Sequence, residues 1–168
     1  LKDIRTGTSM VISILDASNM KKGVVSYKKS LFDIKKTVHE VVEEIRPEAE
    51  EKGLVLTASD DVSGVCVLHG DEVKIRKHII RNLVDNAVRY TTKGSVKVGL
   101  SCTGTVARVV VEDTGIGITP EDKERLFTEG GHGKDSLKTN VHSTGYGLYI
   151  AKQVVDAHHG TINAESAG

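Results

Sequence analysis

The stretch HIIRNLVDNAVRYT, from His78 to Thr91, combines the pattern of a core helix with polar residues that need an explanation. His78, Asn82 and Asn86 recur every four residues, so they form a polar stripe on one side of the helix. An asparagine amide that is buried without partners costs about 1–3 kcal/mol. A spaced pair therefore favours a bound ligand over a solvated face. The other side of the helix is an apolar stripe: Ile79, Ile80, Leu83, Val84, Ala87 and Val88.

The composition narrows the class of protein. A chain of 168 residues is long enough for one domain with a short appendage. Basic and acidic residues balance at 23 each, which argues against a partner that is a nucleic acid or another polyanion. Tryptophan is absent and aromatics are scarce, which argues against a stacking platform for single-stranded nucleic acid.

The ends and the cysteines give weaker information. No signal peptide or membrane-length apolar run is present, and the chain begins at Leu1, so we expect a cytoplasmic piece of a longer protein. Whether that parent is anchored in a membrane stays open. Cys66 and Cys102 lie in apolar, strand-like sequence without metal-ligand spacing, and we expect two buried thiols rather than a disulfide.

The first half of the chain predicts two helices. Residues 1–20 have only a thin apolar edge, typical of the end of a coiled coil or bundle, and Gly23 is a plausible stop. Residues 24–34 read as a strand that leads into a helix from Ile34 to Lys52, which Pro47 interrupts or kinks. The residues expected to face inward on this helix are Val38, Val41, Val42 and Ile45.

The second half predicts a mixed sheet. Residues 53–59 and 64–70 are strand candidates, and Asp71 is a credible N-cap for the helix that contains the opening stretch. Two apolar strands with a turn near Gly104 follow and predict a hairpin. A glycine-rich loop at 128–143 comes next, and a strand at 161–166 is expected to close the domain. Between them we expect a helix at 145–158 that stops at Gly160 and whose inward residues are Leu148, Ala151, Val154 and Val155. The fold class expected is α/β (α+β): a two-layer sandwich whose mixed sheet is covered on one face by about three helices.

The stretch EDTGIGI places an acid and two glycines at the end of a strand. Asp113 follows the apolar run from Val106 to Val111, and Gly115 and Gly117 open a turn. Taken alone, this is most often only a tight turn. A carboxylate there can also accept a hydrogen bond from an exocyclic amine such as that of adenine, and it repels a carbonyl in the same place. Glycines allow a flat base to approach the backbone.

The stretch STGYGLYIAK places Gly145 and Gly147 at the start of the last helix. A helix N-terminus offers unpaired amides and the positive end of the helix dipole, and glycines let a phosphate approach closely. In isolation, a helix start capped by Thr144 is the simpler interpretation. The order of four features favours a ligand site over these simpler structural interpretations. These features are the polar-faced helix, the strand with DxGxG, the loop, and the helix that begins with GxG.

In this order the motifs resemble the ATP-binding catalytic domain of sensor histidine kinases, within the ATPase group that includes gyrase and heat-shock chaperones. HIIRNLVDNAVRYT looks like that family's N box, DTGIGI its G1 box, Leu126 and Phe127 its F box, and STGYGL its G2 box. The resemblance covers about residues 24–168. It implies that residues 1–22 end a dimerisation helix with its linker, and that residues 23–168 form the catalytic domain.

The resemblance implies a role for each matching residue. Asn86 would give its carbonyl oxygen to Mg²⁺, with Asn82 near the phosphates and metal waters. Arg89 would balance phosphate charge, Tyr90 would pack by the nucleotide, and Asp113 would read the adenine amine. The remaining implied ATP-binding residues line the base pocket or close over the phosphates: Gly115, Gly117, Ile118, Phe127, Thr144, Gly145, Tyr146, Gly147 and Leu148.

Asn82 also bears on the reaction type. Relatives that hydrolyse ATP usually carry glutamate at this position, whereas an amide cannot take a proton from water. The resemblance therefore implies transfer of the γ-phosphoryl group to a protein histidine, with Asn82 as a catalytic residue. His39 lacks the sequence context of an acceptor, so we expect the acceptor on a dimerisation domain outside this chain. A response regulator receiver domain and a homodimeric parent are the partners implied.

The other histidines look structural or belong to loops. His158 and His159 end the last helix, where a cation suits the dipole, and His69, His132 and His142 read as loop residues. The latter two, with Lys134 and Lys138, are possible phosphate contacts from the loop, which we interpret as a lid.

Three other functions compete with this interpretation. A serine-directed kinase of the anti-sigma type shares the boxes, but LDASNMKKG at residues 15–23 looks like the junction between a dimerisation bundle and a histidine kinase domain. A non-catalytic ATP-binding module is opposed by the intact Asn86, Asp113 and G2 glycines. A structural α/β domain with chance glycines is opposed by four motifs in order.

Overall fold

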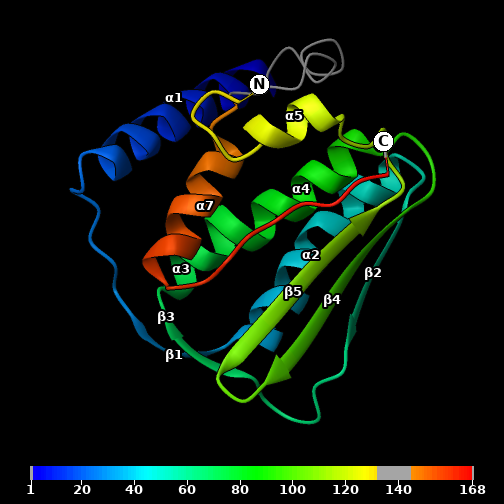
Figure 1. Cartoon of the computed structure of the whole chain (residues 1–168). Helices are drawn as coiled ribbons and strands as arrows, with labels where there is room; N and C mark the ends of the chain where they lie inside the picture. Colours follow the sequence, from blue (N-terminus) through cyan, green and yellow to red (C-terminus); the bar gives the residue numbers. More distant parts are fainter. Residues whose placement is uncertain (1, 132–144, 168) are drawn as a thin grey trace. The chain divides into compact units, whose positions relative to one another are not determined.

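The computed structural model describes residues 2–131 and 145–167, without the side chains of residues 2–10 and 13. The described elements form two compact units, Leu1–Ser26 with Gly117–Gly168, and Tyr27–Ile116. Figure 1 shows the helices and strands along the chain. None of the helices described is long and apolar enough to cross a membrane.

The unit Tyr27–Ile116 is built on a mixed three-stranded sheet. Its strand order is β2 (Val55–Asp60), β4 (Ser95–Thr103) and β5 (Val106–Asp113), with β2 parallel to β4 and β4 antiparallel to β5. Strands β4 and β5 form the predicted hairpin, with Gly104 at φ +60° in its turn. Strands β1 (Ser30–Asp33) and β3 (Val67–Gly70) form a separate antiparallel pair.

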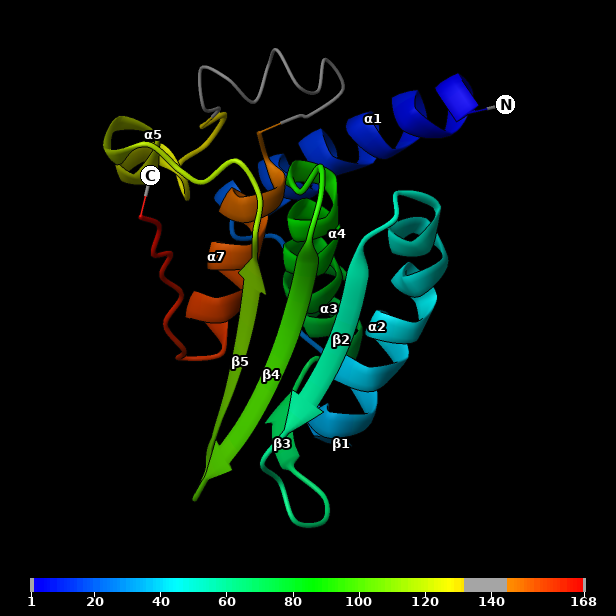
Figure 2. The ribbon, with the colours of Figure 1, turned by 90° about the vertical axis from the view of Figure 1, so that its right-hand side faces the viewer.

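Two helical segments cover one face of the three-stranded sheet (Figure 2). Helix α2 (Ile34–Glu51) lies against β2, and α4 (Arg81–Tyr90) lies against β4 and β5. The expectation of a two-layer α/β fold with a mixed sheet is thereby confirmed. The core of this unit includes Val38, Val41, Val42 and Ile45 of α2, Val84 and Val88 of α4, and Leu56, Val96, Val98 and Leu100 of the sheet.

Helix α2 forms where its residue pattern predicts. The side chain of Asp33 accepts a hydrogen bond from the Lys35 amide at 3.0 Å and so caps the first turn. Gly53, at φ +70°, takes the left-handed conformation that lets the chain leave the helix. An interruption at Pro47 is wrong, because α2 runs through it and its buried face continues at Ala49, while the alternative of a kink stays a prediction.

The second unit contains α1 (Lys2–Lys21), α5 (Pro120–Arg125) and α7 (Gly147–Ala157). Helices α1 and α7 contact each other, and Lys21 pairs with Glu129 at 2.9 Å. Thr119 caps α5 by accepting from the Asp122 amide. On α7 the predicted Ala151 and Val154 are buried with Ile150, whereas Leu148 and Val155 are only half-buried.

Two expected strands differ from the structure. Residues 161–167 form no strand, because Ile162 and Ala164 alone give too small an apolar face to bury. The strand expected over residues 24–34 is limited to β1, and its approach is held instead by the Lys28 amide, which donates to the Asp71 carboxylate at 2.8 Å. His69, expected in a loop, lies on β3.

The prediction of two separate thiols is wrong. Cys66 and Cys102 form a disulfide, with their Cα atoms 6.4 Å apart. Cys66 lies just before β3 and Cys102 on β4, so 36 positions of sequence separate them. Their proximity follows from the tertiary fold, which a spacing rule for neighbouring cysteines does not detect.

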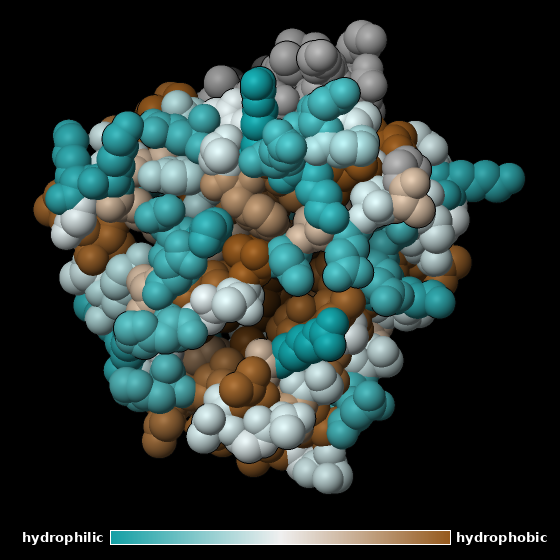
Figure 3. All heavy atoms as spheres, in the orientation of Figure 1, coloured by the Kyte–Doolittle hydropathy of each residue, from teal (hydrophilic) through white to brown (hydrophobic). Residues whose placement is uncertain are grey.

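Large apolar side chains appear on the surface among hydrophilic ones (Figure 3). Apolar atoms contribute much of any folded protein's surface, so a scattered residue such as Leu31 or Val106 indicates no particular site. The exposed apolar residues of α1 differ because they follow one another along one helix: Val11, Ile12, Ile14 and Leu15.

Candidate functional site

The helix with the two asparagines begins as predicted but is not uniform. Asp71 is buried, and its side chain accepts from the Lys74 amide at 3.0 Å to cap α3 (Glu72–Lys74). A π-helical segment, η1 (Ile75–Ile80), follows and continues into α4. At this junction the Arg81 amide donates to the Arg76 carbonyl, five residues back. Apolar periodicity gave no signal for this wider turn, and such turns are frequent at functional sites.

The polar stripe is half-buried. Asn82 and Asn86 lie one turn apart on α4, and neither is fully exposed. The Nδ2 atom of Asn82 is buried and has no hydrogen-bond partner among the residues that the structure describes. Buried polar atoms are nearly always paired, so this amide is set up for a partner that is not part of the described chain.

The end of α4 is fixed by three polar contacts from Lys52. Its ammonium group donates to the carbonyls of Val88 at 2.6 Å, Arg89 at 3.1 Å and Thr91 at 3.3 Å. A cation at a helix C-terminus satisfies carbonyls that lack helical partners and suits the dipole. Thr91 is fully buried, and its hydroxyl donates to the Ala87 carbonyl at 2.7 Å. Sequence reasoning missed this role of Lys52, which lies 36 positions or more before its acceptors.

The DxGxG turn lies against the end of α4. Asp113, exposed at the end of β5, accepts a hydrogen bond from the Gly115 amide at 2.8 Å. The Ile116 amide donates to the Tyr90 carbonyl at 3.2 Å. A Cβ atom on Gly115 would lie 2.6 Å from that carbonyl oxygen, so only glycine fits this approach. The fold thus brings Asp113 and Gly115 to the end of the helix that carries Asn82 and Asn86.

Thr114 holds the same turn from the other side. Its hydroxyl accepts from the Ser95 amide at 3.0 Å and donates to the Lys93 carbonyl at 3.2 Å. Gly94 has φ +114°, and a Cβ there would lie 2.1 Å from this hydroxyl oxygen. The backbone that carries Asp113 and Gly115 is therefore held both by the end of α4 and by the segment before β4.

An ionisable group also lies within the polar helix. Burial raises the pKa of the Asp85 carboxyl, while Arg81, 3.5 Å away, opposes that shift. The sequence analysis did not single out Asp85. Arg89 is exposed and Tyr90 is half-buried, so both are accessible at the end of α4.

The other predicted site residues lie in the unit that contains α7. Gly117 and Gly145 have φ values of +73° and +65°, which glycine adopts at no steric cost. The Ile118 amide donates to the Ser166 hydroxyl at 2.9 Å. Phe127 is half-buried after α5, Tyr146 occupies the N-cap of α7, and Gly147 and Leu148 open the helix. Thr144 and the lid residues His132, Lys134, Lys138 and His142 lie outside the described residues.

The remaining histidines have structural partners or positions. His39 pairs with Asp60 at 2.9 Å, and its rejection as a phosphoryl acceptor stays a prediction. His158 follows α7 directly, with its Nδ1 atom 2.7 Å from the Val154 carbonyl. Within residues 2–131 and 145–167, no three histidine, cysteine or acidic side chains gather in a way that could hold a metal.

Known families place these features in context. The family described as histidine kinase-, DNA gyrase B- and HSP90-like ATPase matches residues 70–168. The chain belongs to this ATPase family. The matched region runs from the end of β3 to the end of the chain and includes both asparagines, the DxGxG turn and the GxG helix start.

The curated relatives of this chain include proteins that are named as histidine kinases or sensor kinases. Signal transduction histidine-protein kinase BarA of Escherichia coli is 31% identical over 165 residues, which are 94% of this chain and 18% of BarA. Autoinducer 2 sensor kinase/phosphatase LuxQ of Vibrio vulnificus is 32% identical over 160 residues, which are 91% of this chain and 18% of LuxQ. The chain thus spans less than a fifth of the length of these relatives.

Solved structures show the same fold. The histidine kinase AdeS of Acinetobacter baumannii superposes with a TM-score of 0.79 at 24% identity, covering 100% of this chain and 76% of that one. Full-length ShkA in complex with AMPPNP gives a TM-score of 0.77 at 24% identity, covering 94% of this chain and 33% of ShkA. The fold expected from the four motifs is therefore that of histidine kinase structures.

Proposed function

We propose that this chain is the ATP-binding catalytic part of a sensor histidine kinase, which transfers the γ-phosphoryl group of ATP to a histidine on a dimerisation domain outside the chain. The observation that carries this proposal is the buried, unpartnered amide of Asn82 on the polar side of α4. Membership of the ATPase family and the sensor kinases among the relatives support the same conclusion.

The two asparagines would hold the polyphosphate and its metal. Mg²⁺ takes oxygen ligands, keeps several waters, and is held by few protein groups when phosphates supply the rest. A single amide oxygen from Asn86 fits such a site, whereas a cluster of acidic residues is not needed. The Nδ2 atom of Asn82 is a donor, so it suits a phosphate oxygen or a metal-bound water rather than the cation itself.

Asp113 and Gly115 would bind the base. The Gly115 amide occupies one carboxylate oxygen of Asp113, which leaves the other oxygen as an acceptor. An adenine amine donates to such an oxygen, and the carbonyl of guanine is repelled by it. The tight contact between Gly115 and the Tyr90 carbonyl keeps this turn flat against the end of α4.

The family resemblance also assigns nucleotide-binding roles to residues of the unit that contains α7. Gly117 and Ile118 continue the DxGxG turn, and Phe127 follows α5. Gly145, Tyr146, Gly147 and Leu148 form the start of α7, where backbone amides lack helical acceptors and attract phosphate. The same resemblance assigns nucleotide contacts to Thr144, and to Arg89 and Tyr90 at the end of α4.

Phosphoryl transfer, rather than hydrolysis, follows from the side chain at position 82. A metal ion bound to the phosphates neutralises charge that develops during transfer. The neutral amide of Asn82 orients the phosphate by donating a hydrogen bond, but it cannot remove a proton from water. ATP would therefore persist in the site until a histidine side chain approaches its γ-phosphorus in line.

Helix α1 would lead into the dimerisation domain. It exposes Val11, Ile12, Ile14 and Leu15 on successive turns, which is the edge that a neighbouring helix in a bundle covers. A receiver domain is proposed as the next phosphoryl acceptor, and a solved complex of the histidine kinase ThkA with the response regulator protein TrrA supports this class of partner.

Calorimetric titration with Mg²⁺ and adenine nucleotide tests the binding step. The chain should bind ATP in preference to GTP, and Asp113→Asn should lower the ATP affinity by at least about tenfold and reduce that preference. Glu112→Gln is the matched control, since the neighbouring exposed carboxylate points to the opposite face of β5. Unchanged selectivity in Asp113→Asn contradicts its assigned role, and no binding by the unaltered chain contradicts the proposed function.

Labelled ATP tests the transfer step. Alone, the chain should form no acid-labile phosphohistidine, and addition of a dimerisation domain that carries an acceptor histidine should produce it. Phosphate on serine would instead indicate the anti-sigma type of kinase. Binding without transfer to any added domain would indicate a regulatory ATP-binding module.

A further inference from the structure

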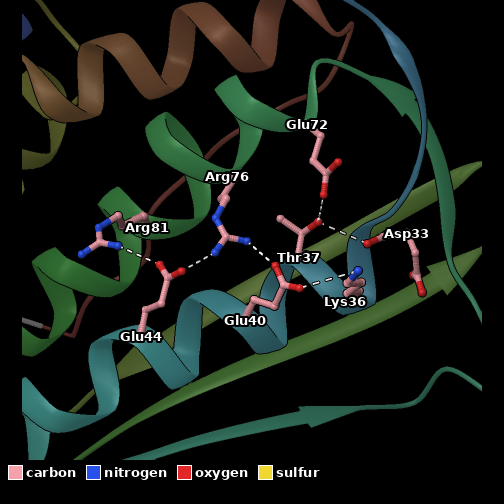
Figure 4. A network of polar contacts seen from close by, with 8 residues as sticks. All are labelled: Asp33, Lys36, Thr37, Glu40, Glu44, Glu72, Arg76 and Arg81. Carbon is pink, nitrogen blue, oxygen red and sulfur yellow. Dashed lines mark hydrogen bonds and ion pairs between the residues drawn. The ribbon is translucent and has the colours of Figure 1, made fainter.

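The π-helical turn before Asn82 is tied to α2 by a network of ion pairs (Figure 4). Arg76, within η1, donates to the carboxylates of Glu40 and Glu44. Arg81, the first residue of α4, donates to the second oxygen of Glu44 at 2.9 Å. One carboxylate thus joins the two arginines on either side of the junction between the π and α segments.

The spacing of these arginines is that of the π turn itself. The Arg81 amide donates to the Arg76 carbonyl, so the two residues lie on adjacent turns of the wide helix. In an α-helix each residue advances by about 100°, and residues five apart point roughly 140° away from each other. The π-helical segment brings both arginines to the side that faces α2, where both guanidinium groups contact the single carboxylate of Glu44.

We propose that Glu44 is a positioning residue: it locks the π-helical turn between Arg76 and Arg81 and thereby sets the direction in which Asn82 faces. The effect of Glu44 on ATP binding rests on the proposed function, whereas its effect on the geometry of the helix does not. Asn82 follows Arg81 directly, so a return of the turn to α-helical geometry changes the register by one residue and rotates the asparagines by about 100° relative to η1.

A second tether holds the other end of the same helical run. The hydroxyl of Thr37, which is fully buried on α2, donates to the Glu72 carboxylate at 3.0 Å. Glu72 lies in the first turn of α3, ahead of the π segment. Thr37 holds the start of the continuous helical segment α3–η1–α4, and Glu44 holds the junction between η1 and α4. This segment therefore has little freedom to slide along α2 when its register changes.

The side chains of Arg76, Glu44 and Arg81 are 28%, 45% and 45% exposed, so solvent screens these pairs. The network therefore contributes modestly to overall stability. Its effect falls instead on the balance between two helical geometries, because the α-helical alternative breaks at least one of the two arginine contacts with Glu44.

The test compares Glu44→Ala with Glu43→Ala. Glu43 is the adjacent carboxylate on α2 and pairs only with Arg46, three residues along the same helix, in the contacts described. Glu44→Ala should raise the dissociation constant for Mg·ATP about three- to tenfold, the range that two half-exposed ion pairs supply. Glu43→Ala should change it by less than about twofold.

Backbone amide exchange and side-chain resonances give a readout independent of binding. In Glu44→Ala the Arg81 amide should exchange faster and the Asn82 side-chain amide should shift, while the same signals stay in place in Glu43→Ala. Glu44→Gln keeps a hydrogen-bond acceptor but loses the negative charge that bridges the arginines. Its changes in Arg81 exchange and Asn82 resonance should lie between those of Glu44→Ala and Glu43→Ala. If the Arg81 and Asn82 signals of both Glu44 variants match the unaltered chain, the lock is refuted, whether or not the chain binds nucleotide.

A double-mutant cycle separates the lock from a general loss of stability. Arg81→Ala and Glu44→Ala should together weaken Mg·ATP binding by less than the sum of the two separate effects, because both break the bridge between Arg81 and Glu44, while Arg81→Ala also removes the contact with Asp85. Additive losses of affinity would contradict the proposal. If Glu44→Ala changes the Arg81 and Asn82 signals as expected but the unaltered chain binds no nucleotide, the positioning role of Glu44 is supported and only the proposed function is contradicted.

Discussion

The amide of Ile116 donates a hydrogen bond to the carbonyl of Tyr90 at 3.2 Å, and this contact joins the turn after β5 to the end of α4. The two residues belong to motifs more than twenty positions apart, the polar helix and the DxGxG turn. The donor follows Gly115, whose missing side chain makes room for the Tyr90 carbonyl. This backbone contact therefore helps to fix the geometry of the proposed base site, together with the hydrogen bonds of Thr114.

Gly115→Ala should disturb this contact. The added Cβ would lie 2.6 Å from both the Tyr90 oxygen and the Asp113 carboxylate, so the turn must move away from α4. We expect a loss of about 1–3 kcal/mol in the free energy of unfolding, as for other overpacked sites, together with weaker ATP binding. Gly99→Ala, in the middle of β4, is the control, since its nearest neighbour would be 3.9 Å away. Equal unfolding midpoints in urea for both variants would contradict this expectation.

The disulfide should contribute strongly to stability. Closing a loop over 36 positions lowers the entropy of the unfolded chain, which corresponds to about 2–4 kcal/mol of unfolding free energy. The loop includes the whole helical run from α3 to α4. A thiol reductant should lower the denaturation midpoint of the chain and leave that of Cys66→Ala/Cys102→Ala unchanged. An identical midpoint with and without reductant in the unaltered chain would show that the bridge has no such effect.

The helical and hairpin elements followed closely from the sequence, because their cause is local. The apolar spacing of α2, the capping residues Asp33 and Asp71, and the turn at Gly104 each act within a few residues. The π turn could not be predicted in this way, since its arginines contact Glu44, which lies on another helix. The strand expected at 161–166 failed because alternation over so few apolar residues is weak evidence.

The candidate site shows the same division. The residue types at Asn82, Asn86 and Asp113 indicated ligand chemistry from their spacing and from a resemblance. The contacts that hold these elements in place could not be predicted in this way: Lys52 reaches the end of α4 from the end of α2, and Cys66, just before β3, is bonded to Cys102 on β4. Each is a contact between distant segments, and a single sequence carries no record of which distant segments meet.

Asp60 should give the domain a defined sensitivity to acid. Hydrogen bonds from Lys35, at 2.8 Å, and from His39 lower the pKa of this carboxyl from 3.8 to about 2. A carboxyl with a lowered pKa stabilises the folded state above its unfolded pKa, and that contribution is lost as the pH falls from about 4 towards 2. In Asp60→Asn the decline of unfolding free energy below about pH 4 should be shallower. Asp61→Asn, at the exposed neighbour, should keep the decline of the unaltered chain.

Asn82→Leu should separate stability from function. Leucine keeps the branching and the number of side-chain heavy atoms of asparagine, although its methyl groups are larger. It removes the buried Nδ2 atom that has no partner in the described chain, so unfolding free energy should rise by about 1 kcal/mol. ATP binding should fall below detection, because the group that meets the phosphates or metal waters is gone. Asn86→Leu should also abolish binding but bring no gain in stability, since the Asn86 amide is not left buried without a partner. Urea denaturation combined with calorimetry measures both quantities. If Asn82→Leu destabilises the free chain, the Asn82 amide already has a partner there, and it is not reserved for a ligand.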